Sequence, residues 1–128
     1  MKPKLLFTLS VIYMGLIGLT VLISPVVVMG LDAGTSAHLI AQVRVQASLY
    51  IGIAVVNWFA RNAEASKARD AIFIGGSVGF SLNTIFVVLA AFSPGVMAGA
   101  IWTVVVINLL FAVAFFVVGR ANMSAAVS

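Results

Sequence analysis

The residues best able to do chemistry in this chain lie in one apolar stretch, from His38 to Arg61. A helix turns about 100° per residue, which puts the polar side chains of this stretch on one side, within about a third of the circumference. They are His38, Gln42, Gln46, Tyr50 and Asn57. An amide or hydroxyl without a hydrogen-bond partner is costly in hydrocarbon, so this stripe should face other helices, a buried water or a bound molecule.

Arg44 lies on a different face of the same stretch, about 200° from Gln42. An arginine at the centre of a membrane span costs about 2.5–3.5 kcal/mol, so it needs a partner or a route to the interface. Asp32 is the acidic residue on that side of the predicted span, and the sequence therefore predicts an ion pair between Asp32 and Arg44. Two alternatives stay open, an arginine that snorkels to the interface and an aspartate that stays in a solvated loop.

Patterns of known catalytic and metal sites are missing from the sequence. It holds no paired carboxylates, no Ser/His/Asp set, no phosphate loop and no cysteine. The single histidine, His38, could ligate a tetrapyrrole or a metal, although a lone histidine more often caps a helix or lies at the interface. Small multidrug transporters share the length of the chain but use a glutamate in their first span, and residues 5–24 contain none. We therefore expect no enzyme, metal, cofactor or proton pathway.

The composition is that of a membrane protein. Hydrophobic residues make up 63% of the 128 residues and charged residues 8%, and the mean hydropathy is +1.24. In soluble domains about a quarter of the residues are charged. The net charge of +4 comes from a few Lys and Arg at the ends and in one loop, which favours contact with anionic lipid headgroups over nucleic acid.

Four apolar segments are long enough to cross a bilayer, because about 20 helical residues span 30 Å of hydrocarbon. They are residues 5–24, 38–60, 71–92 and 98–118. Short connections make neighbouring helices antiparallel, so we predict an all-α, integral membrane four-helix antiparallel (up-down) bundle in a single domain over 1–128. A cleaved signal peptide is the open alternative for the first span.

Small residues predict where these helices approach one another. Gly75 and Gly79 form a small-xxx-small pair, which indicates a tight helix crossing. Gly15 and Gly18 in the first span should also admit another helix closely. Asn83 follows at mid-membrane, where we expect it to bond to the polar stripe of the second span.

Positive charges predict the orientation. All basic residues except Arg44 fall on one side of a four-span arrangement, and this side is expected to be cytoplasmic. They are Lys2, Lys4, Arg61, Lys67, Arg69 and Arg120. Both termini should then lie in the cytoplasm, with the chain in a bacterial inner membrane.

The order of these features carries one resemblance to a known family. The first span ends at Pro25, Tyr50-Ile51-Gly52 follows a polar start of the second, and a basic loop, a glycine-rich third span and a short turn come next. This plan resembles uncharacterised bacterial four-span membrane proteins related to DoxX. Their pattern has an arginine about three residues before the tyrosine, where this chain has Ala47. The resemblance implies the fold and no settled activity.

Two functions fit these observations. The first is a non-enzymatic accessory or assembly subunit that packs against other membrane helices, in a homo-oligomer or a larger complex. The second is a binding site for a lipid, quinone or other apolar small molecule. The residues expected to line it are Gln42, Gln46, Tyr50, Asn83 and Asn108.

Overall fold

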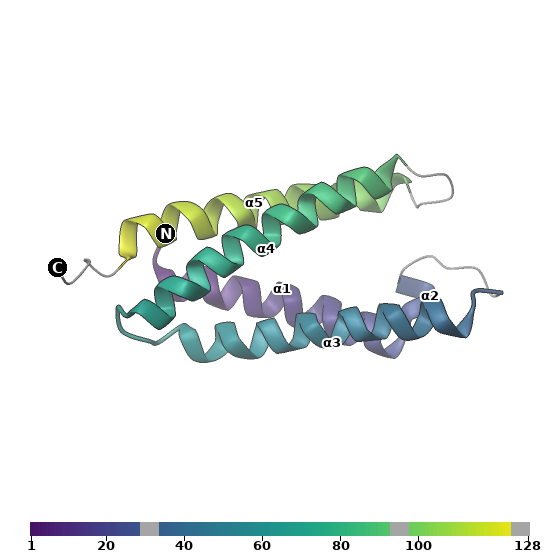
Figure 1. Ribbon diagram of the computed structural model, residues 1–128, viewed down its shortest axis with the longest axis horizontal. Coiled ribbons are helices and arrows are strands. Elements are labelled where there is room, and N and C mark those ends of the chain that lie inside the picture. The colour runs from purple at the N-terminus through teal and green to yellow at the C-terminus, as the bar shows by residue number, and fades with distance from the viewer. Residues whose placement is uncertain (29–33, 93–97, 124–128) are drawn as a thin grey trace. The chain divides into compact units, whose positions relative to one another are not determined.

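The computed structural model describes residues 1–28, 34–92 and 98–123, and every regular element in these ranges is a helix (Figure 1). The helices are α1 (Pro3–Ile23), α2 (Pro25–Val28), α3 (Ala37–Ala60), α4 (Lys67–Ala91) and α5 (Ala98–Asn122). Four of them, all except the short α2, are long and apolar enough to cross a membrane. The predicted all-α fold of a multi-pass membrane protein is confirmed.

Local chemistry determines where most of these helices begin and end. Proline has no backbone N–H, and α1 ends just before Pro25, which opens α2. Ser36 caps α3, because its Oγ accepts a 3.3 Å hydrogen bond from the Leu39 N–H. Ser66 caps α4 in the same way through the Arg69 N–H, also at 3.3 Å. The third span therefore begins inside the basic loop, earlier than predicted.

The end of α5 differs from the prediction for a physical reason. The sequence predicted the fourth span over residues 98–118, before Gly119. The helix instead continues to Asn122. Gly119 is buried against α4, and a Cβ atom built there would lie 2.8 Å from Cβ of Phe73. The absence of a side chain at Gly119 lets α4 pack closely, and α5 continues past this residue.

Contacts divide the chain into two compact units, which are described separately. One consists of residues 7–61 and holds α3 and nearly all of α1. The other consists of residues 1–6 and 62–128 and holds α4 and α5. The single domain over 1–128 stays a prediction.

In the first unit, α1 and α3 form an antiparallel hairpin (Figure 1). Ser10 near the start of α1 bonds to Asn57 near the end of α3, whereas Gly18, further along α1, lies against Ile51 and Ala47. A Cβ atom built on Gly18 would lie 2.7 Å from Cγ1 of Ile51 and 3.0 Å from the Ala47 carbonyl oxygen. The close approach predicted for Gly18 is confirmed.

In the second unit, α4 and α5 pack antiparallel around an aromatic core (Figure 1). Phe115 is fully buried, with ring centroids 6.3 Å from Phe73 and 5.6 Å from Phe80. Phe80 also stacks on Phe111 at 4.9 Å. A Cβ atom on Gly76 would clash with the Phe115 ring, so the absence of a side chain there makes room for the ring.

The crossing of α4 with α5 does not use the glycine pair that the sequence predicted. Gly75 and Gly79 are exposed, and a Cβ atom on either would meet nothing within 4 Å. Gly76 faces α5 instead, because one residue along a helix is a turn of about 100°. Contact of Gly75 and Gly79 with any other helix stays a prediction.

Candidate functional site

The polar stripe predicted on α3 is divided in the structure. His38, Gln42 and Gln46 are exposed and Tyr50 is half-buried, and we call these four residues the polar face of α3. Asn57 does not belong to this face, because it is 3% exposed and packs toward α1.

The rotation of α3 explains this division. Its packed side consists of small residues, among them Val43 and Ala47. Gln42 and Gln46 each precede one of these by a single residue, so they point about 100° away from the side that contacts α1. They are therefore exposed although they lie well inside the helix.

Hydrogen bonds on the polar face join residues one turn apart on the same helix. Nε2 of Gln42 lies 3.0 Å from Nε2 of His38, and Nε2 of Gln46 donates to the Tyr50 hydroxyl at 2.8 Å. Tyr50 thus has the partner that its mid-span position was expected to need. These bonds orient the amides and leave both amide groups on the surface of the helix.

Asn57 instead makes a buried hydrogen bond between helices. Its Nδ2 donates to Oγ of Ser10 at 2.8 Å, and Ser10 is 0% exposed. Sequence reasoning missed Ser10, because a single serine in an apolar span carries no signal of which helix it will face. The bond holds the α1–α3 hairpin in register and leaves Asn57 unsuited to bind a ligand.

The predicted partner of Arg44, Asp32, lies outside the described residues, so their ion pair stays a prediction. Arg44 itself is exposed on the first half of α3. Among the residues that the structure describes, none forms a hydrogen bond or ion pair with its guanidinium group.

Asn83 and Asn108 bond to each other within the α4–α5 hairpin. Asn83 Nδ2 donates to Asn108 Oδ1 at 3.2 Å, and Asn108 Nδ2 donates to the Val104 carbonyl oxygen at 2.9 Å. Asn83 thus bonds to α5, because the antiparallel register puts it opposite Asn108. The expected bond from Asn83 to the second span stays a prediction, and so does the role of both asparagines in lining a ligand site.

Arg69 has a structural role beyond the orientation that its charge predicts, and sequence reasoning missed it. Its Nη2 donates to the carbonyl oxygen of Asn122 at 2.9 Å, and Nη1 donates to that of Ala63 at 3.0 Å. The last carbonyls of a helix lack partners within the helix and favour a positive charge. Arg69 thus caps the end of α5 and ties it to the loop before α4.

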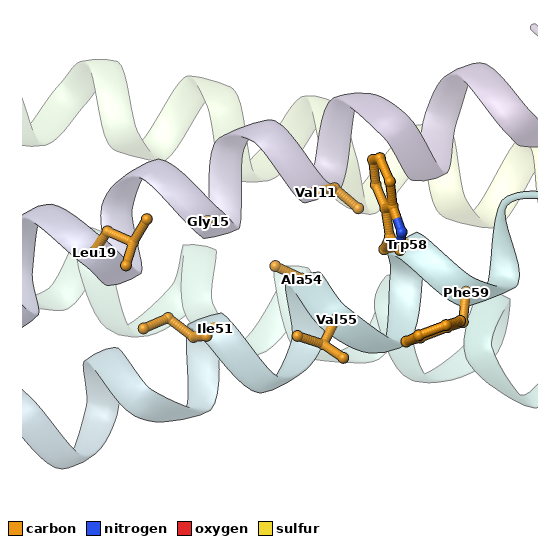
Figure 2. Close-up of a pocket in the computed structure, with 8 residues that line it drawn as sticks. All are labelled: Val11, Gly15, Leu19, Ile51, Ala54, Val55, Trp58 and Phe59. Atoms are coloured by element: carbon orange, nitrogen blue, oxygen red, sulfur yellow. The ribbon is translucent and has the colours of Figure 1, made fainter.

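An apolar groove runs between α1 and α3, with a volume of about 400 Å³ (Figure 2). It is lined by Val11, Gly15, Leu19, Ile51, Ala54, Val55, Trp58 and Phe59. The small residues Gly15 and Ala54 face each other, since a Cβ atom on Gly15 would lie 4.0 Å from that of Ala54. Larger side chains surround this hollow on both helices (Figure 2).

A cation lies beside one end of the groove. Cζ of Arg61 lies 3.0 Å from the centroid of the Trp58 ring, which lines the groove at its Phe59 end. Sequence reasoning missed the groove. No local pattern could have revealed it, because its walls come from segments far apart in the chain.

The described residues offer two surfaces for binding, the polar face of α3 and the groove. In these ranges no group of three or more His, Cys, Asp or Glu side chains could hold a metal ion. The polar face of α3 can exchange hydrogen bonds, and the groove can hold an apolar chain. The resemblance to the DoxX-related proteins stays a prediction. Comparisons with protein-family models, with curated proteins and with solved structures find no match to this chain.

Proposed function

We propose that this chain is a non-enzymatic membrane protein that acts as an accessory or assembly subunit by packing against partner helices. The observation that supports this best is the exposed polar face of α3. The helix has 24 residues, or about 36 Å at 1.5 Å per residue, so Gln46 lies close to its middle. Two glutamine amides are therefore exposed on a helix that crosses hydrocarbon.

Membrane energetics favour a partner at this face. Lipid chains cannot exchange hydrogen bonds with amides, whereas a second helix with hydroxyl or amide groups gains about 0.6–2 kcal/mol per bond. The α3 helix is also the least apolar of the four spans. The partner we expect is a membrane helix that presents polar side chains, in a second copy of this chain or in another protein.

Replacing the two glutamines tests this function. In the double variant Gln42→Leu, Gln46→Leu, we expect the partner to bind about tenfold more weakly, because two bonds of the usual strength are lost. The full chain, tagged and extracted in mild detergent, would be purified and its partner or copy number quantified. Its thermal unfolding should change little, because neither side chain packs against α1 and the two bonds that are lost, to His38 and Tyr50, lie on the surface of one helix.

A matched control changes apolar residues on an exposed face of the same helix. Val45 and Leu49 are 63% and 62% exposed, and the exchange Val45→Leu, Leu49→Val keeps the surface apolar. This control should retain the partner. Equal retention by the double glutamine variant would contradict the proposal, and so would a retained small molecule in place of a protein partner.

We further propose that the chain lies in a bacterial inner membrane with both termini in the cytoplasm, on the basis of its basic residues. The chain has no cysteine, so single-cysteine variants can be labelled without background. An impermeant thiol reagent applied to intact spheroplasts should label Ala33→Cys and should label Ala65→Cys only after permeabilisation. Equal labelling of both, or the reverse pattern, would contradict this topology.

A further inference from the structure

We infer that the groove between α1 and α3 binds an anionic phospholipid, with one acyl chain along the groove and the phosphate at Arg61. This site is separate from the polar face of α3 and does not depend on the function proposed above.

The lining of the groove determines what can enter it. Apart from the indole nitrogen of Trp58, its side chains carry no polar atom. Its volume of about 400 Å³ falls in the range of about 300–1,000 Å³ that small-molecule sites show. The groove lies on helices that cross the membrane, where an empty hollow forfeits dispersion contacts and a flexible acyl chain restores them. A hydrocarbon chain is therefore the chemistry that fits.

The charge at the end of the groove selects the headgroup. Arg61 is half-buried and stacks the face of its guanidinium group on Trp58, which leaves the N–H groups at the edge of that plane. Among the described residues, none accepts a hydrogen bond from the Arg61 side chain. Such an edge matches two phosphate oxygens at once, and a lipid of net negative charge gains most from it.

Arg61 also lies at the right level of the membrane. It is the C-cap of α3, directly after the last residue of this span. A phosphate in the headgroup layer and an acyl chain reaching down beside Val55 and Ile51 would then belong to one lipid molecule. The site thus pairs an apolar groove with a cation at its interfacial end.

Trp58 provides a fluorescent reporter within the site. The second tryptophan, Trp102, is replaced by phenylalanine, and the full chain is reconstituted in phosphatidylcholine with brominated phosphatidylglycerol or brominated phosphatidylcholine at equal mole fraction. Bromine quenches indole fluorescence on contact, so the ratio of the two quenching curves reports lipid preference. We expect apparent binding of phosphatidylglycerol about five times stronger than that of phosphatidylcholine.

Two pairs of variants test which residues bind the headgroup and which bind the acyl chain. Arg61→Gln should abolish the preference for phosphatidylglycerol, whereas Lys67→Gln, which removes an exposed charge from the first residue of α4, should keep it. Gly15→Leu fills the groove and should reduce quenching by both lipids, whereas Gly52→Leu points into open space and should not. Arg61→Lys keeps the charge without the planar fork and should give an intermediate preference, which guards against misfolding of the glutamine variant.

Equal quenching by the two lipids in the parent chain would overturn the proposal. So would a loss of preference in Lys67→Gln as large as that in Arg61→Gln, because the attraction would then be a diffuse effect of positive charge. Unchanged quenching in Gly15→Leu would place the acyl chain outside the groove.

Discussion

Replacing Gly18 by alanine is expected to destabilise the α1–α3 hairpin by about 1–3 kcal/mol, the usual effect of overpacking a close contact. The added methyl group would lie 2.7 Å from Cγ1 of Ile51 and 3.0 Å from the carbonyl oxygen of Ala47. The Ile51 side chain can rotate, but the carbonyl belongs to the backbone of α3. The two helices must therefore separate, which also strains the buried bond between Ser10 and Asn57.

Gly52→Ala is the matched control for this substitution. Gly52 lies in α3 close to the same contact, yet a Cβ atom there would meet nothing within 4 Å. Alanine should be neutral or stabilise the helix by up to about 1 kcal/mol. Denaturation of both variants in mixed micelles with increasing sodium dodecyl sulfate, followed by circular dichroism, measures the difference. Equal stability of the two variants would mean that α1 and α3 do not meet at Gly18.

The helices could be predicted from the sequence because the signals that define them are local. Length and hydropathy identify a span in a bilayer, and Pro25 and Ser36 end or begin helices through their own backbone chemistry. Gly119 shows the limit of such signals, because its close contact with Phe73 on another helix cannot be read from the residues around it.

The side that each helix turns toward its neighbour could not be predicted. In a soluble helix the apolar stripe marks the packed side, whereas in a membrane the lipid-facing side is equally apolar. Gly75 and Gly76 show the consequence, because the two differ by one residue and only the second faces α5. For the same reason, the sequence prediction grouped Asn57 with Gln42 and Gln46, which are exposed. The burial of Asn57 depends on the register with α1, which the local sequence does not contain.

Polar residues within the membrane serve two purposes in this chain. Asn57 with Ser10, and Asn83 with Asn108, form hydrogen bonds between the two helices of a hairpin. The polar face of α3 is different, because the bonds of Gln42 and Gln46 stay on one helix and their amides remain exposed. The first group therefore packs the hairpins, and the contrast supports the association with another helix that we propose for the second.

The largest effect in the α4–α5 hairpin is expected at Phe115. This side chain is 0% exposed and contacts the rings of Phe73 and Phe80, so Phe115→Ala leaves a cavity between the helices. In soluble cores the same change costs about 3–5 kcal/mol, which includes transfer of the ring from water. A bilayer lacks that transfer term because lipid is as apolar as the core, so we expect the cavity contribution of about 2–3 kcal/mol.

Phe116→Ala is the matched control, because it distinguishes the effect of lost packing from that of a less hydrophobic helix. Phe116 is 56% exposed, and Phe116→Ala removes the same atoms from the same turn of α5 without opening a cavity. The Phe116 variant should unfold within about 0.5 kcal/mol of the parent chain, the usual range for surface substitutions. Equal losses in the two variants would indicate that helix hydrophobicity, and not the fit of Phe115 beside Gly76, holds α4 against α5. If the packing of Phe115 stabilises the hairpin, Phe115→Leu should recover part of the stability lost in Phe115→Ala, because leucine fills part of the cavity.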